Sequence, residues 1–203
     1  LVTANELRIP VGQQVFVTVE SADVIHSFWV PKLIGKLDAM PGKSQSLQPF
    51  IPKEVGIYYG LCAEFCGLAH ALMRFRVVVE PLADFQTWVT HLQTSPATPE
   101  ESAVLGEALF NGTCGRCHAV YGTVAEGTVG PNLTLFGERT TLGAGILENN
   151  DANLHAWISN IRDIKPVYED DGGIKVMPSF DEVLSDDQIS SIVDYLRGLK
   201  IDR

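Results

Sequence analysis

The stretch YYGLCAEFCGLAHALMRFRV, residues 58–77, contains two cysteines, a histidine and a methionine within twelve positions. They are Cys62, Cys66, His70 and Met73. The 203-residue chain has only four cysteines and five histidines, so this segment holds a large share of its metal-binding side chains. Three interpretations are open at this point: a disulfide loop, a zinc site and a copper site.

The sequence around this stretch predicts β-structure. In QVFVTVE, residues 14–20, every second residue is a valine, which is typical of a half-buried strand. The run MRFRVVVE, residues 73–80, is rich in β-branched side chains. Glycine and proline recur at short intervals, as in a sandwich or barrel. The cysteine spacing would also fit one helical face, but Gly60, Gly67 and the β-rich flanks favour a loop between strands.

The net charge of −10 is unevenly distributed. Residues 1–96 carry 7 basic and 8 acidic side chains, and residues 97–203 carry 8 basic and 17 acidic ones. The excess is therefore −1 in the first part and −9 in the second. We expect no nucleic-acid partner, because phosphate binding needs a basic surface. The acidic part could steer a basic protein partner or simply keep the chain soluble.

Targeting and anchoring signals are not found in this sequence. No run of eighteen apolar residues could form a transmembrane helix, and the start, LVTANELRIP, does not resemble a signal peptide. We therefore expect either a soluble protein or a soluble fragment whose targeting and anchoring parts are missing.

The second half predicts helices. HLQTSPATPEES, residues 91–102, marks a linker. Helical periodicity follows in residues 100–112 and 151–161. A final helix begins with a capping box formed by Ser185 and Gln188. The apolar positions at helical spacing are Val104, Leu105, Ala108 and Leu109 in the first segment, and Leu154, Trp157, Ile158 and Ile161 in the second.

CGRCH, from Cys114 to His118, matches the attachment sequence of c-type haem. Two thiols at this spacing can add to the two vinyl groups of one porphyrin, and the adjacent histidine becomes the proximal iron ligand. A thioredoxin-like redox pair would need a βαβ setting, which the helical pattern does not provide. The second attachment cysteine is Cys117, and a long loop over about residues 119–150 follows the motif.

The sixth iron ligand is expected far downstream of this motif. Met177 in IKVMPSF lies in a predicted loop just before the terminal helix, and a thioether ligand raises the reduction potential of haem. His155 is the rival, but it falls on a predicted helix beside Trp157. Met40 is also followed by proline, but it belongs to the first half.

The second half resembles class I cytochrome c. The similar segments are LGEALFNGTCGRCHAV, VGPNL, LHAWI, KP, VMPSF and the final helix with Tyr195. In such cytochromes the residues that match Phe110 and Tyr195 pack the terminal helices together near the haem. The resemblance implies one covalently bound haem c.

Haem attachment leaves Cys62 and Cys66 to be explained. A disulfide is acceptable because haem c is attached outside the cytoplasm, but it would leave His70 and Met73 without a role. Zinc would take two thiolates and two histidines, but a thioether is a poor zinc ligand. Thiolate, imidazole and a weak axial methionine are the ligands of copper in electron transfer.

A second histidine would complete a binuclear copper centre in which both thiolates bridge the metals. His26 in SADVIHSFWVP is the obvious source. His91 lies in the predicted linker after the last strand and is the weaker candidate.

DVIHSFWVP, DAMPGK and GLCAEFCGLAHALM resemble the copper-binding domain of cytochrome c oxidase subunit II. With the fused cytochrome, the resemblance extends to the caa-type oxidases. It implies an all-β cupredoxin-like Greek-key barrel in residues 1–92, a linker in residues 93–100 and an all-α class I cytochrome c domain in residues 101–203. The implied ligands of the binuclear CuA centre are His26, Cys62, Glu64 through its backbone carbonyl, Cys66, His70 and Met73.

The function implied by this resemblance is an electron relay. Electrons would pass from an external donor, such as a cytochrome c or a cytochrome bc complex, through haem c and CuA to oxidase subunit I. The chain would be a non-catalytic subunit of an oxidoreductase at the periplasmic face of a bacterial membrane, beside other membrane subunits. Subunit II of this family begins with two transmembrane helices, and this sequence lacks them.

Three alternatives remain open. Some nitric oxide reductases combine CuA and cytochrome c in one subunit, although GLAH and DAMPG favour the oxidase. A free-standing electron carrier would have no membrane partner. A copper chaperone or sensor would exchange its metal and would not need haem.

Overall fold

The computed structural model describes residues 2–94, 103–166 and 177–201. The chain divides into two compact units. The β unit comprises Asn5–Thr87 with Ala144–Ile146, and the helical unit comprises Leu1–Ala4, Trp88–Gly143 and Leu147–Arg203. The predicted linker lies mostly outside the described residues.

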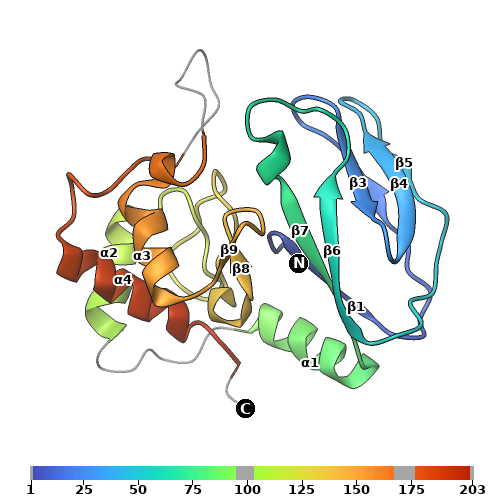
Figure 1. Cartoon of the computed structure of the whole chain (residues 1–203). Coiled ribbons are helices and arrows are strands. Elements are labelled where there is room, and N and C mark those ends of the chain that lie inside the picture. The colour runs from blue at the N-terminus through green and yellow to red at the C-terminus, as the bar shows by residue number, and fades with distance from the viewer. Residues whose placement is uncertain (1, 95–102, 167–176, 202–203) are drawn as a thin grey trace. The chain divides into compact units, whose positions relative to one another are not determined.

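The β unit is built on a five-stranded sheet with the strand order β1-β7-β6-β3-β4 (Figure 1). β1 runs parallel to β7, and the other neighbours are antiparallel. A second, two-stranded sheet pairs β2 with β5. The strands are β1 (Glu6–Pro10), β2 (Thr18–Val19), β3 (His26–Val30), β4 (Ile34–Ala39), β5 (Gln45–Ser46), β6 (Gly56–Cys62) and β7 (Arg74–Glu80).

The core of the β unit follows the alternation of its strands. Val77 and Val79 of β7 are buried with Ile9 and Val30. The predicted strand over residues 14–20 is regular only at Thr18–Val19, although its valines are half-buried and the residues between them are exposed. For residues 14–20 the sequence therefore predicted the buried face better than the length of the strand, whereas the run over residues 73–80 matches β7 in length as well.

The helical unit contains α2 (Val104–Thr113), α3 (Asp151–Ser159) and α4 (Asp186–Gly198). Phe110 of α2 is fully buried, and its ring centre lies 5.3 Å from that of Tyr195 in α4. The predicted capping box of α4 is present, with the Ser185 side chain accepting from the N–H of Gln188. Among the described residues of both units, no helix is long and apolar enough to cross a membrane.

Three local predictions differ from the structure. His91 lies in helix α1 (Leu82–Gln93) and not in a linker. In α2, Val104 and Leu105 face solvent, while Gly106 and Phe110 are buried and Leu109 packs against the core. The helix is therefore correct, and the predicted apolar face is correct only at Leu109. The expected loop over residues 119–150 contains the short helical turn η3 (Phe136–Glu138) and a hairpin of β8 (Thr141–Leu142) and β9 (Leu147–Glu148). The second half is therefore mainly helical rather than purely helical.

Candidate metal and haem sites

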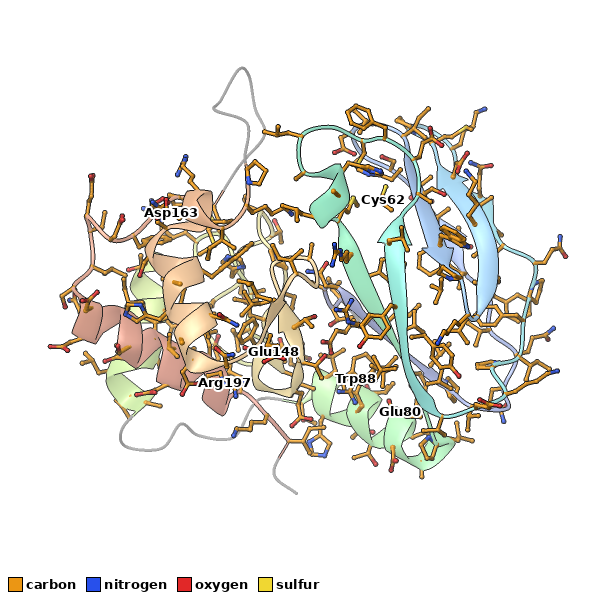
Figure 2. All side chains as sticks on the ribbon, viewed as in Figure 1. Cys62, Glu80, Trp88, Glu148, Asp163 and Arg197 are labelled. Atoms are coloured by element: carbon orange, nitrogen blue, oxygen red, sulfur yellow. The ribbon has the colours of Figure 1, made fainter. Side chains whose placement is uncertain are left out.

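The cysteine loop, residues 62–73, joins β6 to β7. Cys62 is the last residue of β6 (Figure 2), and its backbone N–H donates to the carbonyl of Met73 at 3.0 Å. Gly67 adopts a φ of 119°, which is rare for residues with a side chain. The 3-10 turn η1 (His70–Leu72) follows in the same loop and begins at His70. The loop between strands that the glycines predicted is confirmed.

Five predicted ligand atoms meet within this loop. The Cys62 sulfur lies 3.8 Å from that of Cys66 and 3.2 Å from the carbonyl oxygen of Glu64. The Cys66 sulfur lies 3.5 Å from Nδ1 of His70 and 3.8 Å from the Met73 sulfur. Both thiols are free, and 3.8 Å is far beyond a disulfide bond of about 2.05 Å.

The sixth atom comes from a neighbouring strand. β3 pairs with β6 so that Phe28 lies opposite Cys62, which brings His26 to the same end of the sheet. Nδ1 of His26 lies 3.8 Å from the Cys62 sulfur. The ligand atoms of His26, Cys62 and Cys66 all lie within 4.8 Å of one another. The structure thus brings together the six residues that the resemblance implied for copper, and His91, the weaker candidate, is not among them.

The two thiols differ in acidity. Burial raises the pKa of Cys62, but hydrogen bonds with the backbone of Glu64 and Ser27 and with the His26 side chain outweigh it and bring the pKa to about 7. Burial and the neighbouring Cys62 raise the pKa of Cys66 to about 11. One thiolate therefore forms readily near neutral pH, and the second proton must be displaced when a metal binds both sulfurs.

The donor set suits copper better than zinc. Two cysteine sulfurs and two imidazoles lie in one cluster, with a thioether sulfur and a carbonyl oxygen beside them. Zinc sites prefer four strong N or S ligands, whereas weak axial thioether and carbonyl ligands occur at electron-transfer copper. The residues present fit a copper centre.

Exposed apolar side chains surround this cluster. Val24 and Ile25 precede His26, and Phe65 and Leu68 project from the cysteine loop. Phe65 is 78% exposed, and its ring centre lies 5.7 Å from that of His70 in an edge-on arrangement. The position of Phe65 between the two cysteines gave no signal of this contact in the sequence.

Asp23 is a second residue that the sequence did not single out. One of its carboxylate oxygens lies 2.9 Å from Nε2 of His26. Burial lowers the pKa of His26, but the bonds to Asp23 and Cys62 more than compensate and raise it. Burial raises the pKa of Asp23, but hydrogen bonds with His26, the Val24 backbone and Ser21 outweigh this and lower it.

The haem motif forms a turn at the end of α2. The N–H of Cys114 donates to the Phe110 carbonyl at 2.8 Å, and the N–H of His118 donates to the Cys114 carbonyl at 2.9 Å. Nδ1 of His118 lies 2.8 Å from the carbonyl oxygen of Pro131. Because a carbonyl only accepts, Nδ1 carries the proton and Nε2 keeps a lone pair for a metal.

Two glycines leave room around this motif. A Cβ at Gly127 would collide with the backbone of Cys117, and one at Gly130 would collide with the His118 ring. Burial lowers the pKa of His118, the hydrogen bond to the Pro131 carbonyl opposes this, and the Arg139 guanidinium adds to the lowering, so the net shift is downward. The neutral imidazole that iron requires is therefore favoured, and the residues present fit a haem ligand.

The two rivals for the sixth iron position have different surroundings. Met177 is half-buried and packs against the core of the helical unit. His155 lies in α3, with Nδ1 3.3 Å from the Ser159 hydroxyl and Nε2 3.9 Å from Asp186. Both side chains are half-buried, but His155 has polar neighbours at both ring nitrogens, so the apolar surroundings of Met177 suit an apolar cofactor better. The other half-buried apolar side chains on this core include Leu109, Trp157, Phe180 and Leu184.

The two sites define a class of protein: a β unit with a copper-type cluster of soft ligands, joined in one chain to a mainly helical unit with a c-type haem motif. Comparisons with known proteins agree. Residues 1–81 match the family model of the periplasmic domain of cytochrome c oxidase subunit II. Residues 101–196 match the model of subunit III of cbb3-type cytochrome c oxidase.

Two curated relatives match this chain over nearly all of its length. Cytochrome c oxidase subunit 2 of Alkalihalophilus pseudofirmus is 39% identical over 200 residues, which are 97% of this chain and 55% of that protein. The subunit 2 of Bacillus sp. strain PS3 is 35% identical over 212 residues, covering 100% of this chain and 57% of that protein. The chain therefore spans about half the length of these curated relatives.

A solved structure matches part of the chain. The periplasmic domain of oxidase subunit II from Bradyrhizobium japonicum is 38% identical, with a TM-score of 0.41 over 42% of this chain and 62% of that one.

The chain belongs to the cytochrome c oxidase subunit II family, in the form that carries a cytochrome c domain. Its curled β-sheet is consistent with a cupredoxin-like domain, and the helical region that follows matches a cytochrome c family. These families imply copper in the first unit and haem in the second, and the His26, Cys62 and Cys66 cluster is compatible with copper.

Proposed function

We propose that this chain is the electron-transfer part of subunit II of a haem–copper oxidase of the caa type. It takes single electrons from an external cytochrome c or cytochrome bc complex and delivers them to subunit I, where dioxygen is reduced. The observation that carries the proposal is the convergence of all six predicted copper ligands at one end of the β-sheet, in a chain that also carries CGRCH.

In this proposal the β unit holds a binuclear CuA centre. Cys62 and Cys66 would hold the copper through their sulfurs, and His26 and His70 through Nδ1, the nitrogen that faces the thiols. The weak ligands are Met73, through its sulfur, and Glu64, through its carbonyl oxygen. When bound, this centre and the haem each supply a one-electron carrier. The protein residues hold the ligand atoms close together before metal binds, which limits rearrangement on electron transfer.

In the helical unit, Cys114 and Cys117 attach one haem c covalently. His118 binds iron through Nε2, because Nδ1 is held by the Pro131 carbonyl. Met177 is the proposed sixth ligand. The thioether favours the reduced iron and raises the potential.

The finer fold assignment is also a proposal. Residues 1–92 form a cupredoxin-like Greek-key barrel, residues 93–100 the linker, and residues 101–203 a class I cytochrome c domain. The chain works at the extracytoplasmic face of the membrane, in contact with subunit I and other membrane subunits. In the longer protein, a transmembrane hairpin anchors it there.

Low-temperature EPR of the oxidised, copper-reconstituted protein tests the copper assignment. We expect hyperfine structure from one electron shared by two equivalent coppers, and its loss in Cys62→Ser and Cys66→Ser variants. Ser44→Ala, away from the cysteine loop in sequence, is the control. A single-copper spectrum in the unaltered protein would contradict the proposal.

The haem assignment needs a separate experiment. We expect a c-type reduced spectrum, loss of the iron–thioether charge-transfer band in Met177→Ala, and retention of that band in His155→Ala. If His155 were the ligand, the band would be absent from the unaltered protein, and its low-spin spectrum would be lost in His155→Ala and kept in Met177→Ala. Assembly with the membrane subunits then decides the acceptor, because consumption of nitric oxide instead of dioxygen would favour a reductase, and no association would favour a free carrier.

A further inference from the structure

The two ring nitrogens of His26 have different neighbours. Nδ1 faces the Cys62 sulfur at 3.8 Å, and Nε2 lies 2.9 Å from a carboxylate oxygen of Asp23. A carboxylate only accepts hydrogen bonds, so it selects the form of the ring in which Nε2 carries the proton. The lone pair is then on Nδ1, which points at the thiol cluster.

Asp23 is itself held in place. The hydroxyl of Ser21 lies 3.1 Å from the same carboxylate oxygen and 3.4 Å from the Asp23 nitrogen. Ser21 is anchored in turn by a β-bridge to Pro41, in the segment after β4. The carboxylate thus reaches His26 from a fixed turn, although its side chain is 63% exposed.

His70, the other histidine of the cluster, has a different neighbour. The ring of His70 meets the edge of Phe65, which offers no hydrogen-bond acceptor comparable to a carboxylate. Among the described residues, the carboxylate contact therefore distinguishes the His26 side of the cluster from the His70 side.

We propose that Asp23 is a positioning residue for the copper centre: it fixes the tautomer and ring orientation of His26 and strengthens Nδ1 as a ligand. This inference rests on the proposed copper site. Carboxylate partners of metal-binding histidines commonly act in this way, and their removal typically weakens metal affinity about 10–100-fold. An exposed ion pair adds little to folding stability, so the effect should appear in metal binding and not in unfolding.

The test compares Asp23→Ala and Asp23→Asn with Glu20→Gln, which removes one negative charge from an exposed position three residues away. Copper affinity is measured by competition with a chelator, together with the EPR spectrum and the reduction potential. We expect Asp23→Ala to lose about tenfold or more in affinity and to change the potential and the hyperfine pattern. Asp23→Asn, whose amide oxygen still accepts from Nε2, should retain most of the affinity, and Glu20→Gln all of it. Equal affinity and spectra in Asp23→Ala and the unaltered protein would overturn the inference.

A measurement without copper separates this inference from the proposed function. Nitrogen NMR of the metal-free protein at alkaline pH, where imidazoles are neutral, reports the tautomer of each histidine. We expect His26 with the proton on Nε2 in the unaltered protein and a mixture in Asp23→Ala. If His26 is already mixed in the unaltered protein, the inference fails even when copper binds. If the unaltered protein binds no copper pair, the proposed function fails while the tautomer still decides the role of Asp23.

Discussion

Gly106 in α2 packs on the backbone of Ser191 in α4 so closely that a Cβ at residue 106 would collide with the Ser191 carbonyl oxygen. The same Cβ would also meet the side chain of Tyr195 at 2.9 Å. The two helices can therefore approach this closely only because residue 106 has no side chain. This crossing holds the helix before the haem motif against the terminal helix.

Gly106→Ala should destabilise the helical unit. Overpacking a tight contact costs about 1–3 kcal/mol, and the helix propensity gained from alanine, about 1 kcal/mol at most, does not offset a collision with backbone. Chemical denaturation followed by circular dichroism measures the change. Gly112→Ala in the same helix is the matched control, because a Cβ there meets nothing within 4 Å, and it should be neutral or stabilising. Equal stability of the two variants would show that the helices move apart easily.

Gly130→Ala should impair haem ligation without unfolding the unit. The added methyl group meets the His118 ring, so the imidazole must rotate away from its bond to Pro131. We expect less haem incorporated per protein and a weaker low-spin spectrum in the part that is incorporated. The control is Gly198→Ala, where a Cβ has open space. An unchanged low-spin spectrum in Gly130→Ala would argue against His118 as the ligand held in this orientation.

The buried phenol of Tyr195 should make the folded protein less stable at high pH. Burial, with a contribution from the Glu107 carboxylate, raises its pKa to about 12, against about 10 in an unfolded chain. Below pH 10 the group is neutral in both states, so its full contribution is present, and this contribution is lost as the pH rises through 12. The loss amounts to about 2–3 kcal/mol.

Comparison of Tyr195→Phe with the unaltered protein isolates this effect. The Tyr195 hydroxyl has no hydrogen-bond partner among the described residues. The unfolding free energy of Tyr195→Phe at pH 7 should therefore differ from that of the unaltered protein by no more than about 1 kcal/mol. Between pH 10 and 12 its unfolding free energy should fall less steeply. If the unfolding free energies of the two proteins fall equally steeply with pH over that range, Tyr195 ionises normally in the folded state.

The acidic part of the chain predicts salt-dependent electron entry. Residues 97–203 carry 17 acidic and 8 basic side chains, which attract a basic cytochrome over distances that salt shortens. The rate of reduction by such a cytochrome should therefore fall as ionic strength rises, while reduction by an uncharged small donor should not. If both rates are independent of salt, the charge serves solubility alone.

The candidate sites could be proposed from the sequence because their residue types and spacings are tied to chemistry. The cysteine loop and CGRCH are local motifs, and a glycine-containing stretch between strand-like runs correctly indicated a loop. Asp23 could not be recognised this way, because an aspartate three residues before a histidine resembles any surface carboxylate. Its role depends on which ring nitrogen it reaches, and only the fold determines that.

The errors in the fold also have physical causes. In α2 the apolar spacing pointed to Val104 and Leu105, but the close helix crossing places Gly106 and Phe110 on the buried face. The hairpin of β8 and β9 has strands of only two residues, too short for an alternating pattern. α1 could have been found, because Phe85, Trp88, Val89 and Leu92 recur at helical spacing.

The histidine on β3 has a consequence for how the chain is cross-linked. Contacts between side chains inside the cysteine loop join residues four to seven positions apart, whereas His26 and Cys62 are 36 positions apart. By loop-closure entropy, joining the distant pair restricts a denatured chain by about 2 kcal/mol more than joining residues four positions apart. A metal bound to all of these residues would therefore cross-link β3 to β6. Loss of His26 alone would remove this cross-link and leave the ligands of the cysteine loop in place.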